Sequence, residues 1–369
     1  MKFKDFPGGV QQVTPIVVTI IVVLVSISCS YLFFRRNKLY TFKSLLQLYE
    51  KKHAYEELDE KIEVNEKGDN NNNEEGKKEK KMFLNNKTTN ITLQYVITLT
   101  KTVKIFIFSY PNEYKYLGLG ICKHLKFSCT NVQGKIRGKW NNKEDVEKNL
   151  NKIFRSYTPV YIDKKNNLIH FIIRVYHPDA QFIDGGKLST YLNRMSIKTN
   201  VEINGPYGLL EYKGNNNFVY LSKQLKITKH LVLIAGGTGM TPFFRLLNHL
   251  LFSEKDKEKH IYITFIYANR NEDEILLKSV FDGYEEQFTN FKRVYSVDTC
   301  LRSSNKNLFE NIGYLNIDIL KKYILKFEKL DIPIKKKDTL VLLCGPPPMT
   351  AFIKTIIKDQ MEMQNFIIL

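Results

Sequence analysis

Two residue types are scarce in this 369-residue sequence: there are 5 cysteines and a single tryptophan. No two cysteines form a C-x-x-C pair, and no group of cysteines and histidines has the spacing of a zinc site. This pattern argues against a disulfide framework and against a structural metal. We therefore expect a reducing compartment and no bound metal.

Acidic residues are also underrepresented, with 38 Asp and Glu against 56 Lys and Arg, for a net charge of +18. Such an excess favours an acidic partner, which could be a nucleic acid, an anionic lipid or a protein. The lysines are scattered rather than striped with aromatic residues on one face, which argues against nucleic-acid binding. A bias in composition is the alternative, because lysine and asparagine are plentiful even where the chain looks unstructured.

The region before residue 92 lacks the texture of a folded domain. After a short segment, 1–12, residues 13–34 contain no charge, and as a helix of roughly 33 Å they would cross a bilayer core of about 30 Å. The arginines that follow at once predict an anchor with the rest of the chain in the cytoplasm. A cleavable signal peptide is the alternative, since Ser28 and Ser30 could suit a peptidase. Residues 35–91 are expected to form a polar, low-complexity tether.

Residues 92–228 have the pattern of an antiparallel β-domain. The stretch "TLQYVITLTKTVKIFIFSY" (92–110) alternates apolar and polar residues, and further strand-like pieces are separated by Gly, Pro and Asn. A charged stretch, 131–154, interrupts this pattern, and we interpret it as a loop insertion with one short helix.

Residues 229–369 instead alternate apolar strands with helical segments. Strands are predicted at "HLVLIAG", "HIYITFIYAN", "FKRVYSVD" and "DTLVLLCG", each followed by a helix. Strands that are apolar nearly throughout are typical of a parallel sheet covered on both faces. The pattern predicts a doubly wound α/β domain, with ligands at the carboxyl ends of its strands.

Two of those strand ends are rich in glycine and proline: "AGGTGMTP" (235–242) and "CGPPPM" (344–349). Glycines without Cβ let a flat or charged ligand approach the backbone, and a helix beginning near Thr241 would direct N–H groups at a phosphate. Pro242 is compatible with a first helical turn. A glycine turn that only lets a helix pack on the sheet is the alternative.

Together with their order along the chain, these motifs resemble the ferredoxin reductase-like flavoproteins, and most closely the NADH–cytochrome b5 reductases among them. "RSYTPV" (155–160) and "GGKLSTYL" (185–192) are similar to the flavin motifs of that family, and "NGPYGLLEYKG" and "YANRNEDEILL" also resemble its blocks. The resemblance covers about residues 92–369. It implies an antiparallel β-barrel FAD domain (92–228), followed by a doubly wound NADH domain (229–369). The expected fold class adds the N-terminal transmembrane helix.

The resemblance also implies roles for individual residues. In the FAD domain, Arg155 would pair with the diphosphate, Tyr157 would lie against the flavin, and Thr158 would hydrogen-bond near its reacting nitrogen. The full set implied for FAD is Arg155, Ser156, Tyr157, Thr158, Ile172, Arg174, Gly185, Gly186, Lys187, Leu188, Ser189 and Thr241. Arg174 stands where the family uses lysine. His124 matches a family histidine near the flavin.

For NADH, the resemblance implies Gly236, Gly237, Thr238, Asp298, Cys344, Gly345 and Pro346. Asp298 would hydrogen-bond the ribose and repel a 2′-phosphate, and nearby Arg302 could soften that preference. Cys344 would border the reacting carbon of the nicotinamide. The implied catalytic residues are Thr158, Cys344 and His124. The C-terminal Leu369 departs from the aromatic residue usual in the family.

The implied function is hydride transfer from NADH to FAD, and then single-electron transfer to cytochrome b5 or a similar acidic haem protein. No H-P-G-G haem box occurs, so the haem must lie on another chain. A related flavoenzyme with another acceptor, or a membrane-tethered binding module without catalysis, remain alternatives. We expect a monomer anchored in the endoplasmic reticulum or the mitochondrial outer membrane, facing the cytoplasm.

Overall fold

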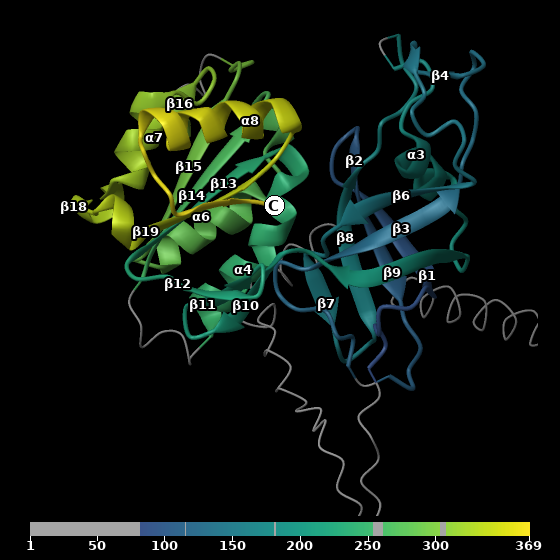
Figure 1. Cartoon of the computed structure of the whole chain (residues 1–369), viewed down its shortest axis with the longest axis horizontal. Coiled ribbons are helices and arrows are strands. Elements are labelled where there is room, and N and C mark those ends of the chain that lie inside the picture. Colours follow the sequence, from purple (N-terminus) through teal and green to yellow (C-terminus); the bar gives the residue numbers. More distant parts are fainter. Residues whose placement is uncertain (1–81, 115, 181, 254–260, 303–307) are drawn as a thin grey trace, which may run out of the picture. The chain divides into compact units, whose positions relative to one another are not determined.

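The computed structural model describes residues 82–369, except for 115, 181, 254–260 and 303–307. The strands and helices expected after residue 92 are present, except for the short helix expected within 131–154. The β-domain and the α/β domain each have their own main sheet and their own hydrophobic core (Figure 1).

The first sheet is antiparallel and corresponds to the expected β-barrel. In sheet order, its strands are β6 (Lys152–Tyr157), β3 (His124–Thr130), β9 (Asn200–Tyr207), β1 (Thr89–Thr98), β2 (Val103–Ser109), β8 (Leu168–Arg174) and β7 (Tyr161–Asp163). Phe108, Phe127 and Phe171 pack edge to face inside it, and helix α3 (Lys187–Arg194) adds Leu188 and Leu192 to the same core. A small sheet of β10 (Leu210–Gly214), β11 (Asn217–Tyr220) and β12 (Lys223–Lys226) follows.

The second sheet is parallel throughout. In sheet order, its strands are β16 (Asn311–Ile312), β15 (Phe291–Val297), β14 (Tyr262–Asn269), β13 (His230–Gly236), β19 (Thr339–Cys344) and β20 (Phe366–Ile368). From β13 the chain first builds outward through β14, β15 and β16, and then returns to add β19 on the other side. The strand order therefore reverses between β13 and β19, which is where a doubly wound sheet opens a crevice for ligands.

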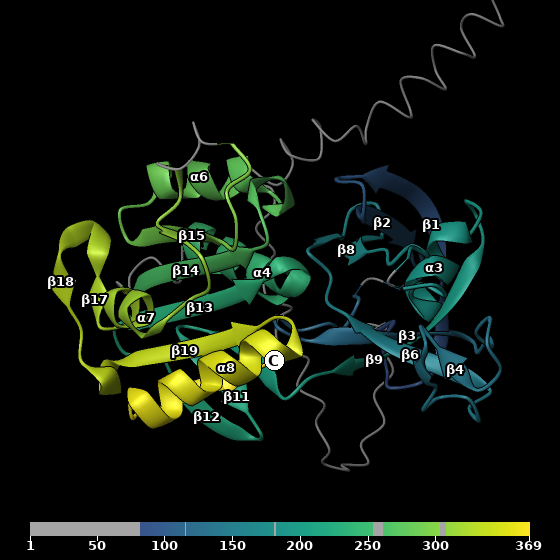
Figure 2. The same cartoon turned by 90° about the horizontal axis from the view of Figure 1, so that it is seen from above.

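Helices cover both faces of this sheet (Figure 2). One face carries α7 (Ile317–Ile324) and α8 (Pro347–Thr355), whose apolar side chains share a core with Val232, Ile234 and Val341. The other face carries α4 (Thr241–Phe252) and α6 (Lys278–Gln287), joined by the Phe244–Phe281 contact. Burial on both faces explains why these strands are apolar at nearly every position.

Two expectations need correction. The expected fold class included a transmembrane helix, but no helix of the described residues is long and apolar enough to span a membrane. The longest described α-helix, α4, has 12 residues and is about 18 Å long. The segment 13–34, where that helix was expected, lies outside the described residues. The corrected fold class is an antiparallel barrel domain followed by a parallel-sheet domain.

The prediction of a short helix within 131–154 is also wrong. The structure shows turns and a small hairpin of β4 (Lys139–Trp140) and β5 (Lys143–Glu144) instead. Asn141 and Asn142 connect its two strands with positive φ angles of 51° and 65°, a conformation that a helix does not use. Two acidic side chains of this segment, Asp145 and Glu147, contact the barrel domain, as described below.

A buried histidine at the start of β13 makes the stability of the sheet sensitive to acid. The Nδ1 atom of His230 lies 3.2 Å from the carbonyl of Ile324, and Nε2 lies 2.8 Å from the hydroxyl of Thr264. Because a carbonyl only accepts, Nδ1 donates to Ile324; when the ring is neutral, Nε2 accepts from the Thr264 hydroxyl. Burial lowers its pKa to about 4, although the hydrogen bond to Ile324 opposes the shift.

The unfolded chain takes up a proton at His230 below about pH 6.5, whereas the folded chain does so only near its lowered pKa. The contribution of the neutral His230 ring to the free energy of unfolding is therefore complete above pH 6.5 and is lost as the pH falls toward 4. We expect the His230→Asn variant to lose less free energy of unfolding over this interval than the parent, by on the order of 2 kcal/mol. Urea titrations of both proteins at pH 7 and 4.5 measure this difference. The same loss in both proteins would contradict it.

Candidate active site

The two glycine-rich motifs of the second domain meet at the point where the strand order reverses. Strands β13 and β19 are neighbours, and Ala235 pairs in register with Cys344, so "AGGTGMTP" and "CGPPPM" leave the sheet side by side. The sequence places these motifs more than a hundred residues apart. The parallel pairing brings them to one edge, at the carboxyl ends of the strands where ligands bind in this architecture.

The glycines of this edge have two different tasks. A Cβ added to Gly239 would lie 2.4 Å from the carbonyl oxygen of Cys344, and one added to Gly236 would lie 2.5 Å from Sδ of Met349. These two glycines therefore let the motifs pack against each other. Gly237 differs, because its φ is +53° and the only atom near an added Cβ is Nη2 of Arg174 at 3.9 Å. Gly237 is thus the position where bare backbone is open to a ligand.

Helix α4 begins at Thr241, as the sequence predicts, and it follows a short 3₁₀ turn, η3 (Gly237–Met240), that is not predicted from the sequence. Pro242 lies in its first turn, and no side chain caps it. The Thr241 N–H donates to the carbonyl of Thr238, and Pro242 has no N–H, so the helix dipole is what favours an anionic ligand at this point. Thr238 is half-buried and Thr241 is buried, so Thr238 is the more accessible of the two.

Cys344 ends β19, and Gly345 and Pro346 lead from it into α8. Burial raises the pKa of its thiol to about 12. The side chain is therefore a neutral thiol at physiological pH. It can border a ring system but does not supply a thiolate nucleophile.

Asp298 follows β15, and its N–H donates to the carbonyl of Asn269 at the end of β14. Burial raises the pKa of its carboxyl, with Arg270 acting in the opposite direction. Arg302 is held elsewhere: its guanidinium lies 3.0 Å from Asp273, and its backbone N–H donates to Glu272. Asp298 therefore lies at the carboxyl edge of the sheet, and the nearby Arg302 is already paired.

In the barrel, Arg155 lies on β6, and Ser156 and Tyr157 end that strand just before Thr158. The Arg155 guanidinium forms two parallel hydrogen bonds, of 2.7 and 2.8 Å, with the carboxylate of Glu147. The ring of Tyr157 packs edge to face on Phe127, and Thr158 is half-buried. The Arg155 fork is thus oriented to bind an anion and already holds a carboxylate, the kind of contact it would make with a diphosphate.

The "GGKLS" residues form the turn into helix α3, which packs against β3 and β6. The N–H groups of Gly185 and Gly186 donate to the carbonyls of Phe182 and Tyr176, so they are used within the protein. Helix α3 has no side-chain cap, which leaves the N–H groups of Lys187, Leu188 and Ser189 as the donors of its first turn. These donors and Arg155 fit a diphosphate.

Three other predicted residues lie on strands β8 and β3. Ile172 and Arg174 are on β8, where Ile172 is buried and the Arg174 guanidinium lies 2.9 Å from Glu274. His124 begins β3 and stacks on Tyr207 at 6.2 Å. Burial lowers the pKa of His124, and Lys126 and Lys123 lower it further. The His124 ring is therefore neutral, and a neutral ring suits an aromatic neighbour better than an anion.

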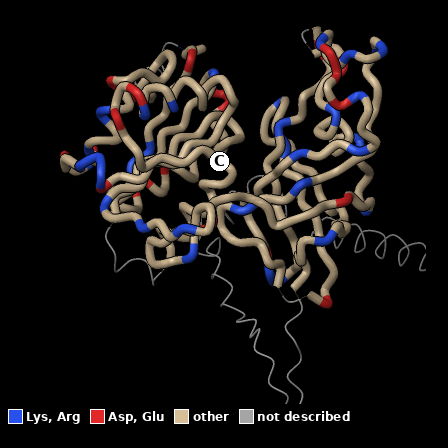
Figure 3. Tube along the Cα trace, in the orientation of Figure 1, with Lys and Arg blue, Asp and Glu red and all other residues tan. Residues whose placement is uncertain are grey.

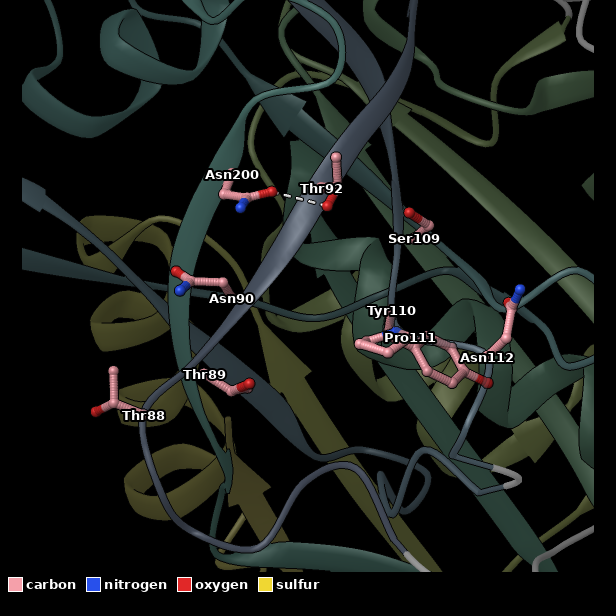
Figure 4. A pocket seen from close by; sticks show the side chains of 9 residues that line it. All are labelled: Thr88, Thr89, Asn90, Thr92, Ser109, Tyr110, Pro111, Asn112 and Asn200. Carbon is pink, nitrogen blue, oxygen red and sulfur yellow. Dashed lines mark hydrogen bonds between the residues drawn. The ribbon is translucent and has the colours of Figure 1, made fainter.

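A separate groove of about 640 Å³ lies where β1, β2 and β9 meet the loop after β2 (Figure 4). Hydroxyl and amide side chains line it, among them Thr92, Asn200 and Ser109, and Thr92 donates to Asn200 at 2.8 Å. None of its lining residues is charged, and none belongs to the predicted site. The groove therefore does not suit a diphosphate, and we do not assign it to either cofactor.

Comparison with known families assigns a class to each domain. Residues 90–212 match the family model described as the oxidoreductase FAD-binding domain, and residues 233–355 match the oxidoreductase NAD-binding domain. The two matches coincide with the antiparallel and parallel sheets. The chain is thus a flavoprotein oxidoreductase with one domain for FAD and one for NAD.

Individual relatives narrow the class. The chain is 32% identical over 259 residues to a nitrate reductase [NADH] of Solanum lycopersicum, and 30% identical over 272 residues to one of Hordeum vulgare. These matches cover 69% and 73% of this chain but only 25% and 26% of the relatives, so the chain spans about a quarter of their length.

Two solved structures share the fold. The cytochrome b5 reductase domain of Ulva prolifera nitrate reductase has a TM-score of 0.64 at 23% identity, covering 78% of this chain and all of that one. Ferredoxin-NADP+ reductase from Plasmodium falciparum has a TM-score of 0.52 at 15% identity, covering 76% and 95%. The chain belongs to the ferredoxin reductase-like flavoproteins, with an FAD-binding and an NAD-binding domain.

Sequence reasoning missed the part of the site contributed by the 131–154 segment. Glu147, Asp145 and Asn141 all contact the predicted flavin residues or their turn. Glu147 is only eight positions before Arg155, which is the one signal that could have indicated it. Nothing in the sequence shows that this segment folds back onto the "GGKLS" turn, since the contacts depend on side chains rather than on a periodic pattern.

The close packing at Gly239 predicts a site-specific cost. A methyl group there would collide with backbone, so we expect the Gly239→Ala variant to lose about 1–3 kcal/mol of stability. Gly283→Ala in helix α6 is the matched control, because a Cβ there meets no atom within 4 Å. This second variant should be unchanged or more stable, by about 0.5–1 kcal/mol. Denaturant titration measures both changes, and equal stability of the two variants would contradict the packing role of Gly239.

Proposed function

We propose that this chain takes hydride from NADH through FAD and passes the electrons singly to a haem protein, cytochrome b5 or a similar acidic one. The observation that carries the proposal is the meeting of two glycine-rich strand ends at the reversal of a parallel sheet, in a chain that also has an FAD-binding domain. When bound, FAD supplies the step between a two-electron donor and a one-electron acceptor.

The chain's own residues bind and orient the two cofactors. Arg155 and the first turn of α3 would hold the FAD diphosphate, and Thr158, directly after β6, would hydrogen-bond the flavin. Gly237 would admit the nicotinamide nucleotide to the backbone, and Cys344 would border its ring as a neutral thiol. None of these residues needs to form a covalent bond, so their contribution is position and polarity.

We propose that the charge of Asp298, directly after strand β15, determines the preference for NADH over NADPH. A carboxylate at Asp298 would accept hydrogen bonds from a ribose and repel a 2′-phosphate. Arg302 would not compensate, because it pairs with Asp273 in a loop that Glu272 also holds. The relatives named as NADH-dependent support the same direction.

Nucleotide preference is tested by mixing the purified flavoprotein anaerobically with NADH or NADPH and following the flavin absorbance. Bleaching should be faster with NADH, by on the order of a hundredfold, since juxtaposed like charges cost several kcal/mol. Asp298→Thr should narrow this gap. Asp338→Asn, a charge-matched control at the opposite edge of the sheet, should leave it unchanged. Equal rates with the two nucleotides in the parent would refute the role of Asp298.

An acidic haem acceptor predicts a dependence on salt. The chain carries 56 basic and 38 acidic residues, and basic positions are distributed over both domains (Figure 3). Weak electron-transfer encounters between opposite charges are accelerated by long-range attraction, which salt screens. NADH-driven reduction of cytochrome b5 should therefore slow at least about fivefold between 0.01 and 0.3 M ionic strength. A rate that is independent of salt would contradict steering by charge.

A further inference from the structure

Residues 131–151 form a strap that folds over the turn into helix α3. The indole N–H of Trp140 and the amide of Asn141 both donate to the carbonyl of Gly185, at 2.8 and 3.0 Å. In return, the side-chain oxygen of Asn141 accepts from the N–H groups of Asp184 and Gly185. The strap thus binds the turn whose helix provides the predicted diphosphate donors.

A buried ion pair attaches the strap to α3. The Lys187 ammonium lies 2.8 Å from the Asp145 carboxylate and also donates to Asn131 at 3.0 Å, with side-chain exposures of 2% for Lys187 and 6% for Asp145. The Trp140 ring lies against the same ammonium at 4.9 Å. Separating a pair that is so deeply buried leaves an uncompensated charge, so this contact is a permanent anchor.

A second acidic residue of the strap, Glu147, forms an ion pair with Arg155. Glu147 binds the guanidinium with two hydrogen bonds and also lies 3.6 Å from Lys187. The Arg155 side chain is 43% exposed and that of Glu147 is 21% exposed. This pair can therefore separate at small cost, because water can solvate both partners once they part. The pKa of Glu147 is lowered, first by its hydrogen bond with Arg155, which keeps the carboxylate ionised.

We propose that Glu147 is a built-in competitor for the FAD diphosphate at Arg155, held in place by the Asp145–Lys187 anchor, and that it sets the affinity for FAD. The proposal rests on the assignment of Arg155 to the diphosphate. A carboxylate and a phosphate offer the same bidentate acceptor geometry to a guanidinium, so the two cannot share the fork. The diphosphate displaces Glu147 on binding, and Glu147 returns to Arg155 when FAD leaves.

The two acidic residues of the strap thus have different roles. Asp145 neutralises a cation that is out of reach of solvent and fixes the strap. Glu147 neutralises Arg155, a cation that is accessible to solvent. It gives Arg155 a partner when FAD is not bound, and it thereby lowers the affinity for FAD. Figure 3 shows acidic and basic positions close together in the loop that carries β4.

The test is the dissociation constant for FAD, measured by quenching of flavin fluorescence as apoprotein prepared from the purified holoprotein is titrated. Glu147→Gln keeps the shape of the side chain and removes its charge. It should lower the dissociation constant about fivefold, the effect expected when a half-exposed ion pair no longer competes, and FAD should leave the holoprotein correspondingly more slowly. Thermal unfolding of the apoprotein checks that the variant is folded.

Glu144→Gln is the matched control. Glu144 lies three residues away on the same strap, pairs with Lys148 at 3.1 Å and is 77% exposed. Its loss changes the net charge by the same amount, so any effect of general electrostatic attraction on FAD affinity appears equally in both variants. A fivefold change confined to Glu147→Gln supports direct competition at Arg155.

An Arg155→Gln background completes the test. If Glu147 acts through Arg155, Glu147→Gln should no longer change the FAD dissociation constant when Arg155 is absent. Unchanged or weaker FAD binding by the single Glu147→Gln variant would overturn the competitor role while leaving FAD binding by the parent intact. Failure of the parent itself to bind FAD would overturn the flavin assignment and the proposal with it.

Discussion

The contact on which the nucleotide site depends is the packing of one glycine backbone on the end of a neighbouring strand. Gly239 approaches the carbonyl of Cys344 so closely that no side chain fits between them, and Gly236 makes a similar contact with Met349. The parallel pairing of β13 and β19 brings the two motifs to the place where the sheet reverses its order, and this contact lets them pack closely there. Gly237, which is not used in the packing, is thereby left as the exposed backbone between them.

Charge rather than packing organises the flavin half. The first turn of α3 and the Arg155 fork form a region that attracts anions, and the protein already places two carboxylates there. One is buried with its partner and holds the strap to the barrel, whereas the other lies nearer to water. Exposure therefore separates a structural ion pair from one that can exchange, although both join the same segment to the same site.

The pKa shifts agree with a site that works by position. Burial keeps the Cys344 thiol and the His124 ring neutral, and neither is poised as a nucleophile or a strong base at physiological pH. A reaction in which the cofactors carry the electrons does not require such groups. The protein contributes a fixed edge and, in the proposed function, cations for the phosphates and a carboxylate that favours NADH over NADPH.

The sequence by itself determined the two sheet types, the helix that begins at Thr241 and the motifs at both strand ends, because these depend on local apolar periodicity and on glycine and proline. The roles of Arg155 and Asp298 follow from a resemblance and remain predictions. Only the tertiary structure decided which glycines pack and which is open, that the 131–151 strap contains a hairpin instead of a helix, and that Glu147 occupies Arg155. Those features arise from contacts between side chains and backbone that no repeating pattern records, so they become visible only once the chain has folded.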